Sequence, residues 1–552
     1  EMEIDGALPE SAASSPLGAF SDTDNSLQGM LAALDAARTD ARIVGVFLRI
    51  GAQPLPMAQA QELRNALSAF RDVSKPVLAF SESYDDVGFG TGFYLAAAAD
   101  EVWLQPSGEI GMTGLAIETP YVRELLDEVG ILPEFGQRKD YKSFPDTFLR
   151  ERSSQANKEA LQSLAGSLVD QLATGIAESR DLSPASVRAA IDAAPLLATE
   201  AADRGLIDQI GYTDEAEARL RQRVGPGSTG ISIEDYAASS DTDEDSEPSQ
   251  ATLAVISASG PIHRGESDFS AFEGSTSIGS DTLVALLRDA ADDEDVDAII
   301  LRIDSPGGSY VASDTVWREI VRIREGHRGN PSKPVIATMG SVAASGGYYI
   351  AMAADRIVAH PATLTGSIGV FSGKFSASEL WDRLGIAWDT TKVGQYADMM
   401  SLNRGFTDEE VARMDRWLDT VYADFVGKAA QSRQMTPQAL EAVAQGRVWT
   451  GVQARDAGLI DALGGFDETL EVTRAVLGLE EDAPVDVIDW GVEDDPLEIL
   501  SAVLNEDFAL IGTAVRGLAY VGHLGHVIER ELGLAPTARQ ELSVPPPYTL
   551  IQ

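Results

Sequence analysis

The chain has 552 residues, 44% of them hydrophobic, so it can bury substantial cores but is too long for one, and roughly three or four domain-sized units are expected. Its 87 acidic and 42 basic residues give a formal net charge of −45, which argues against nucleic acid or an anionic membrane surface as the main partner and suits a solvated, salt-adapted surface. Cysteine is absent, so disulfides and thiolate metal sites are excluded.

The chain also lacks a membrane-spanning pattern, because it contains no run of about 18 apolar residues. It begins with Glu1 rather than with methionine, and we expect that a signal or anchor segment has been removed. Any membrane anchor is therefore expected to lie outside this sequence.

Two copies of one unit fill most of the chain. The segment GTGFYLAAAADEVWLQPSGEIGMTGL at residues 90–115 recurs as SGGYYIAMAADRIVAHPATLTGSIGV at residues 345–370, with a constant offset of 255 residues. Glycine, tyrosine, alanine, aspartate and proline occupy matching places in the two segments. The sequence therefore predicts a tandem duplication, with an N-terminal repeat over residues 1–225 and a C-terminal repeat over residues 251–482.

An acidic segment separates the two copies. Residues 239–250 read SSDTDEDSEPSQ, which is rich in serine and acidic residues and has no apolar periodicity. Such a composition cannot bury enough apolar surface to fold by itself. We therefore predict a solvated acidic linker over residues 226–250.

The C-terminal repeat alternates strand and helix signals. Short β-branched runs predict strands, in chain order TLAVISASG (252–260), VDAIILRI (296–303), KPVIATMG (333–340) and RIVAH (356–360). Amphipathic stretches predict helices over SDTLVALLRDAAD (280–292) and SDTVWREIVRIRE (313–325). Apolar strands separated by such helices are typical of a parallel sheet that helices cover on both faces, so the predicted fold class is α/β.

A helical tail is predicted after the second copy, over residues 483–552. Apolar residues recur at helical spacing between residues 499 and 534. The polar face of this helix carries Glu506, Asp507, Glu529 and Glu531 against only Arg516 and Arg530. Because helices that lie on membranes usually carry a basic polar face, we expect the tail to pack on the protein or on a neighbouring subunit.

Ser345 is the candidate nucleophile. It falls just after the strand KPVIATMG and at the start of the helix GGYYIAMAAD, beside N–H groups that the helix leaves unpaired. A serine hydroxyl attacks only when a base takes its proton. None of the five histidines has the sequence setting of a catalytic triad, so the other known base is a lysine whose burial keeps it neutral.

Three glycines are candidate donors for an oxyanion. Gly307 and Gly308, in IDSPGGS, follow a buried strand, and their lack of side chains lets a carbonyl group approach closely. Gly346 directly follows Ser345 at the start of the helix. Their backbone N–H groups are predicted to form the oxyanion hole of an acyl-transfer site.

The N-terminal repeat has no equivalent site. It has Gly90 opposite Ser345 and Met112 opposite Ser367, and it reads GAQPL where the second copy reads DSPGG. A single site, in the C-terminal repeat, is therefore expected.

The motifs SPGGS, MGSVAASGGYY and LTGSIGVF on a duplicated frame resemble the signal peptide peptidase A family in its long form, the protease IV type. The resemblance covers essentially residues 1–480 and implies a tandem Clp protease/crotonase-like fold. It implies a serine endopeptidase with a Ser–Lys dyad, in which Ser345 is the nucleophile, a lysine of the first copy is the general base and Ser367 positions that lysine. Neither a metal nor a cofactor is expected.

The same resemblance implies a setting for the enzyme. Members of this family are anchored in the bacterial inner membrane, with the catalytic part on the periplasmic side, and assemble into a bowl. The expected substrates are cleaved signal peptides and other unfolded apolar peptides. The expected assembly is a homo-oligomer, a tetramer, and no nucleic acid partner is expected.

The lysine of the first copy lies in GQRKDYKSFPDTF, which contains both Lys139 and Lys142. The offset of 255 places Lys142 opposite Ala397, whereas an offset of 258 places Lys139 there. The match of Tyr-Lys-Ser to the family pattern assigns the base to Lys142. The first copy then keeps the lysine and lacks the serine, so our hypothesis is that the two copies share one active site.

Two functions other than a peptidase are compatible with parts of the sequence. A crotonase-like acyl-CoA enzyme also uses paired backbone N–H groups, to hold an enolate, but it needs an acidic base near the glycine loop and leaves Ser345 unexplained. A non-catalytic scaffold suits the first copy but not the second, which has every part of an acyl-transfer site.

Overall fold

The computed structural model of the chain describes residues 1–10, 26–239, 248–267, 269–270, 275–326 and 331–491. The elements of the first half are β1 (Met2–Ile4), α1 (Leu27–Thr39), β2 (Val46–Ile50), α2 (Met57–Asp72), β3 (Val77–Ser81), β4 (Tyr84–Gly88), α3 (Thr91–Ala96), β5 (Glu101–Leu104), β6 (Glu109–Met112), α4 (Arg123–Val129), β7 (Leu132–Arg138), α5 (Asp146–Leu149), α6 (Gln155–Arg180), α7 (Pro184–Ile191), β8 (Leu196–Leu197), α8 (Ala198–Asp203), β9 (Gln209–Ile210), α9 (Thr213–Val224) and α10 (Ile233–Ser239).

The elements of the second half are β10 (Ala251–Ser259), β11 (Ile262–His263), β12 (Phe269–Ser270), β13 (Ser275–Thr276), β14 (Ile278–Gly279), α11 (Ser280–Asp292), β15 (Ala298–Ser305), α12 (Tyr310–Glu325), β16 (Val335–Ala344), α13 (Gly346–Ala351), β17 (Arg356–Ala359), β18 (Leu364–Gly366), β19 (Val370–Ser376), α14 (Ser378–Arg383), α15 (Asp408–Ser432), α16 (Pro437–Val443), β20 (Val448–Thr450), α17 (Gly451–Asp456), β21 (Ala462–Leu463), α18 (Phe466–Leu477) and β22 (Val485–Asp489).

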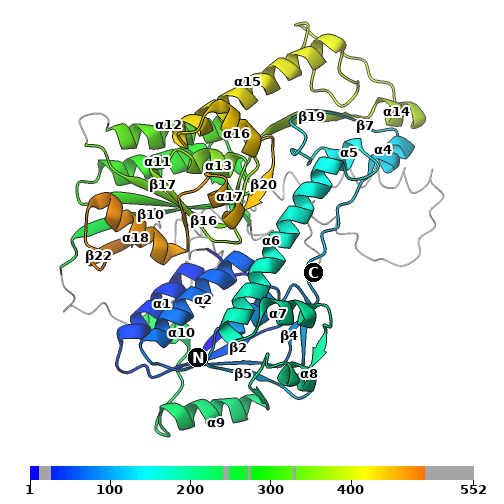
Figure 1. Ribbon diagram of the computed structural model, residues 1–552. Helices are drawn as coiled ribbons and strands as arrows, with labels where there is room; N and C mark the ends of the chain where they lie inside the picture. The colour runs from blue at the N-terminus through cyan, green and yellow to red at the C-terminus, as the bar shows by residue number, and fades with distance from the viewer. Residues whose placement is uncertain (11–25, 240–247, 268, 271–274, 327–330, 492–552) are drawn as a thin grey trace.

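Each repeat is built on its own sheet, and helices flank both sheets (Figure 1). The first sheet has the strand order β1-β2-β3-β5-β9, with every neighbouring pair parallel. The second has the order β20-β18-β16-β15-β10-β22, with β17 and β21 attached beside β16, and its β18–β20 pair is antiparallel while its other pairs are parallel. The predicted α/β class with parallel sheets is confirmed.

Matching elements of the two halves keep the spacing found in the sequence. Helix α13 starts 255 residues after α3, and β17 starts 255 residues after β5. Each half also has its own apolar core, one drawn from residues between Met2 and Tyr236 together with Ala362, and one from residues between Ala254 and Ile460. The duplication read from the sequence is therefore a duplication of the fold.

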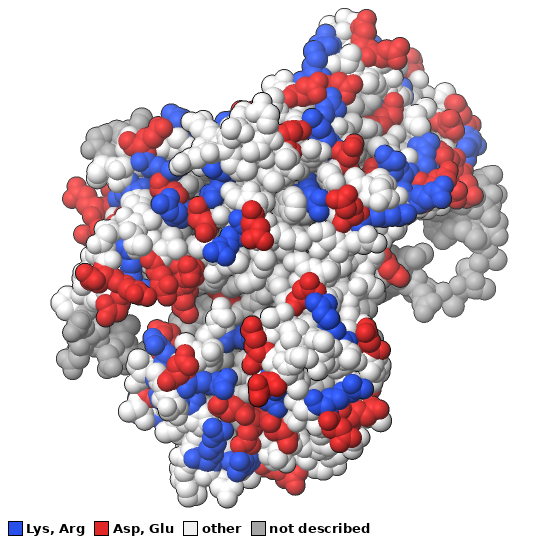
Figure 2. Space-filling view, viewed as in Figure 1, with Lys and Arg blue, Asp and Glu red and all other residues white. Residues whose placement is uncertain are grey.

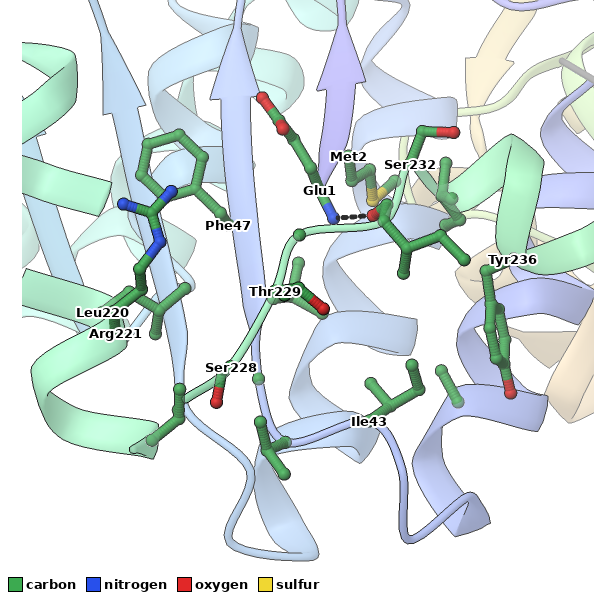
Figure 3. A pocket seen from close by; sticks show the side chains of 18 of the residues that line it. Glu1, Met2, Ile43, Phe47, Leu220, Arg221, Ser228, Thr229, Ser232 and Tyr236 are labelled. Carbon is green, nitrogen blue, oxygen red and sulfur yellow. Dashed lines mark hydrogen bonds between the residues drawn. The ribbon is translucent and has the colours of Figure 1, made fainter. Parts of the chain in front are cut away.

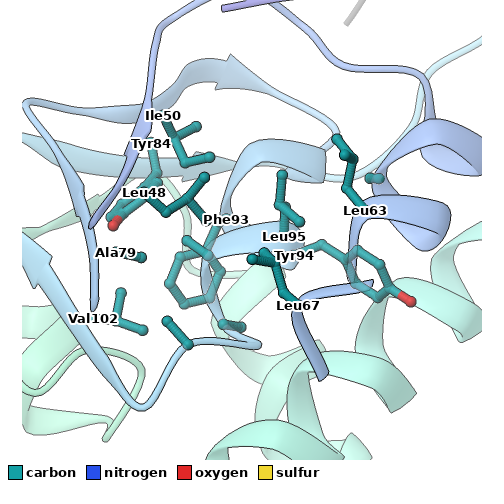
Figure 4. Packing of buried hydrophobic residues seen from close by; sticks show 14 of the residues in the cluster. Leu48, Ile50, Leu63, Leu67, Ala79, Tyr84, Phe93, Tyr94, Leu95 and Val102 are labelled. Carbon is teal, nitrogen blue, oxygen red and sulfur yellow. The ribbon is translucent and has the colours of Figure 1, made fainter. Parts of the chain in front are cut away.

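The core of the first repeat shows how α3 is held. Figure 4 shows Phe93 of this helix among Leu48, Ala79 and Val102 of the sheet. All six residues of α3 are buried, because the helix lies between its sheet and the neighbouring helices α2 and α6. Helix α13, which follows Ser345, is likewise buried at all six positions. Its start is therefore fixed firmly in the second repeat.

The two repeats are joined by an antiparallel ribbon that the repeat pattern did not predict. Strand β7 of the first repeat pairs with β19 of the second over seven residue pairs, from Leu132↔Ser376 to Arg138↔Val370. The ribbon lies in the projecting part of the molecule together with α4, α14 and α15 (Figure 1). It carries the chain that follows β7 towards the second repeat.

A buried ion network also joins the repeats. Arg302 of β15 is 1% exposed, and its guanidinium lies 2.6 Å from Glu10 and 2.9 Å from Glu62, both of the first repeat. Breaking such a buried network by removing one partner costs several kcal/mol, because it leaves an unpaired charge away from water. The relative placement of the two repeats is therefore tied to these three side chains.

Part of the predicted linker over residues 226–250 is folded. Residues 233–239 form α10, which packs on α1, and its Ile233 and Tyr236 are buried because they lie three residues apart on one face of the helix. Together with the preceding residues, α10 lines a pocket of about 370 Å³, in which the amino group of Glu1 donates a hydrogen bond to the carbonyl oxygen of Ile231 (Figure 3). We propose that the first repeat extends to residue 239.

The predicted tail also begins differently. Residues 485–489 form β22, a strand that pairs parallel with β10 at the edge of the second sheet, rather than part of a helical tail. We propose that the second repeat includes this strand, because its hydrogen bonds complete the exposed edge of β10. The helix predicted over residues 499–534 lies outside the described residues.

Charged residues of both signs are mixed on the face that Figure 2 shows. On the face shown in Figure 2, lysine and arginine lie among aspartate and glutamate rather than forming a basic patch. Among the helices that the structure describes, none is both long enough and apolar enough to cross a bilayer.

Candidate active site

Ser345 stands at the turn between β16 and α13 in an unusual backbone conformation. Its φ of 54° and ψ of −115° lie in a region that costs a residue with a side chain of the order of 1–3 kcal/mol. The turn is held by the Ser345 N–H, which donates to the carbonyl oxygen of Gly366, and by the Ser345 carbonyl oxygen, which accepts from the N–H of Tyr349, each at 2.9 Å. The surrounding structure therefore maintains a strained turn at the serine, as is common at functional sites.

Lys142 of the first repeat reaches this turn. Its Nζ lies 3.0 Å from Ser345 Oγ, 2.9 Å from Ser367 Oγ and 3.0 Å from the Ser367 carbonyl oxygen. The side chain is only 6% exposed, and no carboxylate among the described residues pairs with it. Burial therefore lowers the pKa of Lys142 from 10.5 to about 7.

A third segment, which sequence reasoning missed, holds Lys142 in place. The Tyr141 N–H donates to the carbonyl oxygen of Gln445 at 3.2 Å. At Gly446, whose φ is +83°, a β-carbon would lie 2.5 Å from the β-carbon of Lys142, so only glycine fits there. The same loop accepts the Ser367 N–H at the carbonyl oxygen of Arg447, at 2.7 Å. A glycine just before a strand was the only sequence signal for this loop.

Lys139, the alternative base, points elsewhere. Its Nζ lies 2.8 Å from a carboxylate oxygen of Glu441, and its side chain is 48% exposed. It also lies over the ring of Tyr422, 5.3 Å from the centroid. Of the two lysines, the structure thus brings Lys142 and not Lys139 to Ser345.

The three predicted oxyanion glycines lie together, but their N–H groups differ. Gly307, with a φ of +103°, donates its N–H to Ser305 Oγ at 3.1 Å. The N–H groups of Gly308 and Gly346 have no acceptor among the described residues. The two loops touch directly, since a β-carbon on Gly307 would lie 2.5 Å from the nitrogen of Gly346. Two free N–H groups beside one serine are what an oxyanion hole requires.

The matching place in the first repeat is filled. Gly90 begins α3 with a φ of +96°, as Ser345 begins α13, but a β-carbon on Gly90 would lie 2.5 Å from the β-carbon of Met112. Met112 occupies the place that Ser367 has in the second repeat. A serine could therefore not be accommodated in the first repeat without repacking.

The described residues contain no group of three or more histidine, aspartate or glutamate side chains arranged to hold a metal ion. The pocket of Figure 3 shares no residue with the cluster around Ser345.

Comparison with known proteins identifies the family. The profile of peptidase family S49 matches residues 69–226 and 328–480, one segment in each repeat. The chain is 33% identical over 483 residues to Protease 4 from Salmonella typhi, covering 84% of this chain and 74% of that protein. It is 32% identical to the chloroplastic serine protease SPPA of Arabidopsis thaliana, covering 85% of this chain and 68% of that protein.

A shorter relative matches fewer residues. A putative signal peptide peptidase SppA from Enterococcus faecium is 31% identical over 246 residues, which are 44% of this chain and 69% of that protein. Taken with the strained serine and the buried lysine beside it, these matches show that the chain belongs to peptidase family S49 and is a serine peptidase.

Proposed function

We propose that this S49 peptidase is an endopeptidase that uses Ser345 as its nucleophile and Lys142 as its general base. The observation that carries the proposal is the 3.0 Å contact between Lys142 Nζ, from the first repeat, and Ser345 Oγ, from the second. Each repeat supplies the group that the other lacks, so a single site needs both.

The contacts of Lys142 suit a neutral amine. A neutral amine has two N–H groups and one lone pair. The carbonyl oxygen and the hydroxyl of Ser367 can accept the two N–H bonds, which directs the lone pair towards the hydroxyl proton of Ser345. With a pKa of about 7, roughly half of the molecules hold a neutral lysine at pH 7, on the order of 10³ times more than at an ordinary lysine pKa.

The reaction then follows two acyl-transfer steps. Lys142 takes the hydroxyl proton as Ser345 Oγ attacks the peptide carbonyl carbon, and it gives that proton to the leaving amine as the C–N bond breaks. In the second step Lys142 takes a proton from water, whose oxygen attacks the acyl-enzyme, and returns the proton to Ser345 Oγ as the ester bond breaks. Ser367 positions the amine throughout.

The proposed oxyanion hole uses the N–H groups of Gly308 and Gly346. Both groups have no acceptor within the described residues, and they belong to two loops in direct contact. Gly307 contributes shape rather than a donor, because its N–H is already bonded to Ser305. Such fixed donors stabilise the charge that develops on the carbonyl oxygen.

We further propose that the substrates are unfolded apolar peptides, including cleaved signal peptides. The name of the Enterococcus faecium relative supports this substrate class. Burial of the base supports it as well, since an apolar substrate that displaces water keeps the lysine neutral.

We also propose a homo-tetramer, anchored in the bacterial inner membrane with the peptidase on the periplasmic side. The crotonase-like alternative has no support from the family match.

The proposal is tested with a fluorogenic apolar peptide and a fluorophosphonate that labels activated serines. Ser345→Ala and Lys142→Ala are expected to lose cleavage and labelling while remaining folded. Thr338→Val is the matched control, because it removes a hydroxyl from the same strand, β16, and it should retain both activities. Cleavage by Ser345→Ala would refute the assignment of the nucleophile. Binding of an acyl-CoA without phosphonate labelling would instead favour the crotonase-like enzyme.

A further inference from the structure

The strand that leads to Ser345 contains a bulge next to the site. Between β15 and β16 the register shifts, so that Ile303 pairs with Met339 but Ser305 pairs with Ala343. Asp304 alone therefore stands opposite residues 340–342. A bulge leaves backbone N–H groups without partners in the sheet, and those groups need another acceptor.

Asp304 supplies that acceptor. Its Oδ1 accepts the N–H of Val342 at 2.8 Å, and its carboxylate also accepts the N–H of Ser341. The strands approach closely here, since a β-carbon on Gly340 would lie 3.2 Å from the β-carbon of Asp304. The bulge is thus closed by a side chain from the neighbouring strand rather than by the sheet.

Asp304 connects the two strands that lead to the two loops of the site. Asp304 directly precedes Ser305, whose Oγ accepts the N–H of Gly307. The bulge that Asp304 holds ends three residues before Ser345. A shift of the bulge relative to β15 would therefore move Ser345 relative to the glycine loop.

The surroundings make a charged group here costly. Burial, and the nearby carboxylate of Glu10, raise the pKa of Asp304 to about 6, while Arg302 acts in the opposite direction. Arg302 donates to Glu10 at 2.7 Å, so the first repeat contributes directly to the setting of Asp304. A carboxylate kept in such a place calls for a role beyond packing.

We propose that Asp304 is a positioning residue: its carboxylate fixes the bulge at residues 340–342 against β15 and thereby sets the position of Ser345 relative to the N–H groups of Gly308 and Gly346. The inference rests on the proposed role of Ser345 as nucleophile. Asp304 itself does not touch the substrate.

A comparable aspartate gives a matched control. Asp297 Oδ2 accepts the N–H of Thr252 at 2.8 Å, so it also ties neighbouring strands of the second sheet. It lies at the start of β15, at the end of the strand opposite to Asp304. Removing its carboxylate removes a similar hydrogen bond without disturbing the bulge.

The experiment compares Asp304→Ala, Asp304→Asn and Asp297→Ala. It measures kcat and KM on the fluorogenic peptide, the rate of fluorophosphonate labelling of Ser345, and urea unfolding. Asp304→Ala should lower kcat and the labelling rate on the order of 10²-fold with KM changed less than about twofold, because a misplacement of the order of 1 Å has that effect. Asp304→Asn keeps an oxygen that can accept the Val342 N–H, so its kcat and labelling rate should be only about tenfold below those of the wild type. Asp297→Ala should keep the wild-type kcat.

The outcomes separate the inference from the function on which it rests. An unchanged kcat in Asp304→Ala would overturn the inference, and so would equal losses of kcat in Asp304→Ala and Asp304→Asn. If Asp304→Ala does not fold, Asp304→Asn decides the matter: a kcat and labelling rate within about tenfold of the wild type in that folded variant support an acceptor role, whereas a 10²-fold loss opposes it. Failure of the wild-type enzyme to be labelled at Ser345 would instead refute the proposed function.

Discussion

Replacing the proposed base with methionine should make the protein inactive and, at neutral pH, more stable. Methionine matches lysine in length but carries no titratable group. In the folded protein the pKa of Lys142 is about 7, against an ordinary value of 10.5. Between these two values the unfolded chain holds a proton on Lys142 that the folded chain does not. The free energy of unfolding of the wild type therefore rises with pH in this window, by about 1.4 kcal/mol for each pH unit.

The size of the effect follows from the width of that window. Below pH 7 the full cost of burying Lys142 is present, about 5 kcal/mol, and above pH 10.5 it is absent. Methionine escapes this cost but loses the hydrogen bonds to Ser367, which are worth about 1 kcal/mol each at any pH. Lys142→Met should therefore exceed the wild type in stability by roughly 2–3 kcal/mol at pH 7, and this advantage should shrink as the pH rises.

The assay is urea unfolding of both proteins at several pH values between 7 and 9. All other titrating groups are shared, so the difference between the two free energies of unfolding isolates Lys142. Lys139→Met serves as the control, because it removes a lysine of the same segment whose side chain is 48% exposed and pairs with Glu441 rather than with Ser345. A difference between Lys142→Met and the wild type that stays constant from pH 7 to 9 would refute the reasoning, since it would mean that the folded protein keeps Lys142 protonated.

Three further predictions follow from contacts around the site. Lys139→Ala should retain most peptidase activity, because its amine pairs with Glu441 at 2.8 Å rather than with the serine, and a steady-state assay beside Lys142→Ala checks this. Gly346→Ala should lower kcat by about 10²–10³-fold in the same assay, because the added β-carbon disturbs a proposed oxyanion donor; an unchanged kcat would remove that donor from the site. Arg302→Ala should lower the free energy of unfolding by about 3–5 kcal/mol, because it removes the guanidinium that two buried carboxylates share, and a loss below about 1 kcal/mol in urea unfolding would contradict this.

Sequence patterns alone predict the architecture and the serine side of the site. The duplication is visible as a repeat in the sequence. The strands, the helices and the position of Ser345 at the start of α13 follow from local patterns, because strand and helix periodicity extend over a few residues. The grouping of the glycine loop with Ser345 was also predictable, since both follow neighbouring parallel strands of one sheet. Comparison of the two copies showed that the first had lost the serine.

Features that depend on distant contacts escaped sequence reasoning. The loop around Gly446 that holds Lys142, and the bulge closed by Asp304, have no periodic signature. The sequence placed residues 233–239 in a linker and 485–489 in a helical tail, because a short helix and an edge strand beside acidic segments give weak signals. These two segments are recognised as folded elements only from the packing of α10 on α1 and the pairing of β22 with β10.

The choice of the lysine that contacts Ser345 depends on the packing of the two repeats. The sequence contained two lysines three residues apart, and the choice rested on a three-residue match to a family pattern. Pairing of β7 with β19 brings Lys142 to within 3.0 Å of a serine that lies 203 residues away in the chain, and leaves Lys139 at the surface. Burial then lowers the pKa of Lys142, and burial is a property of the surrounding fold, because the same residue in an unfolded chain would be hydrated and charged.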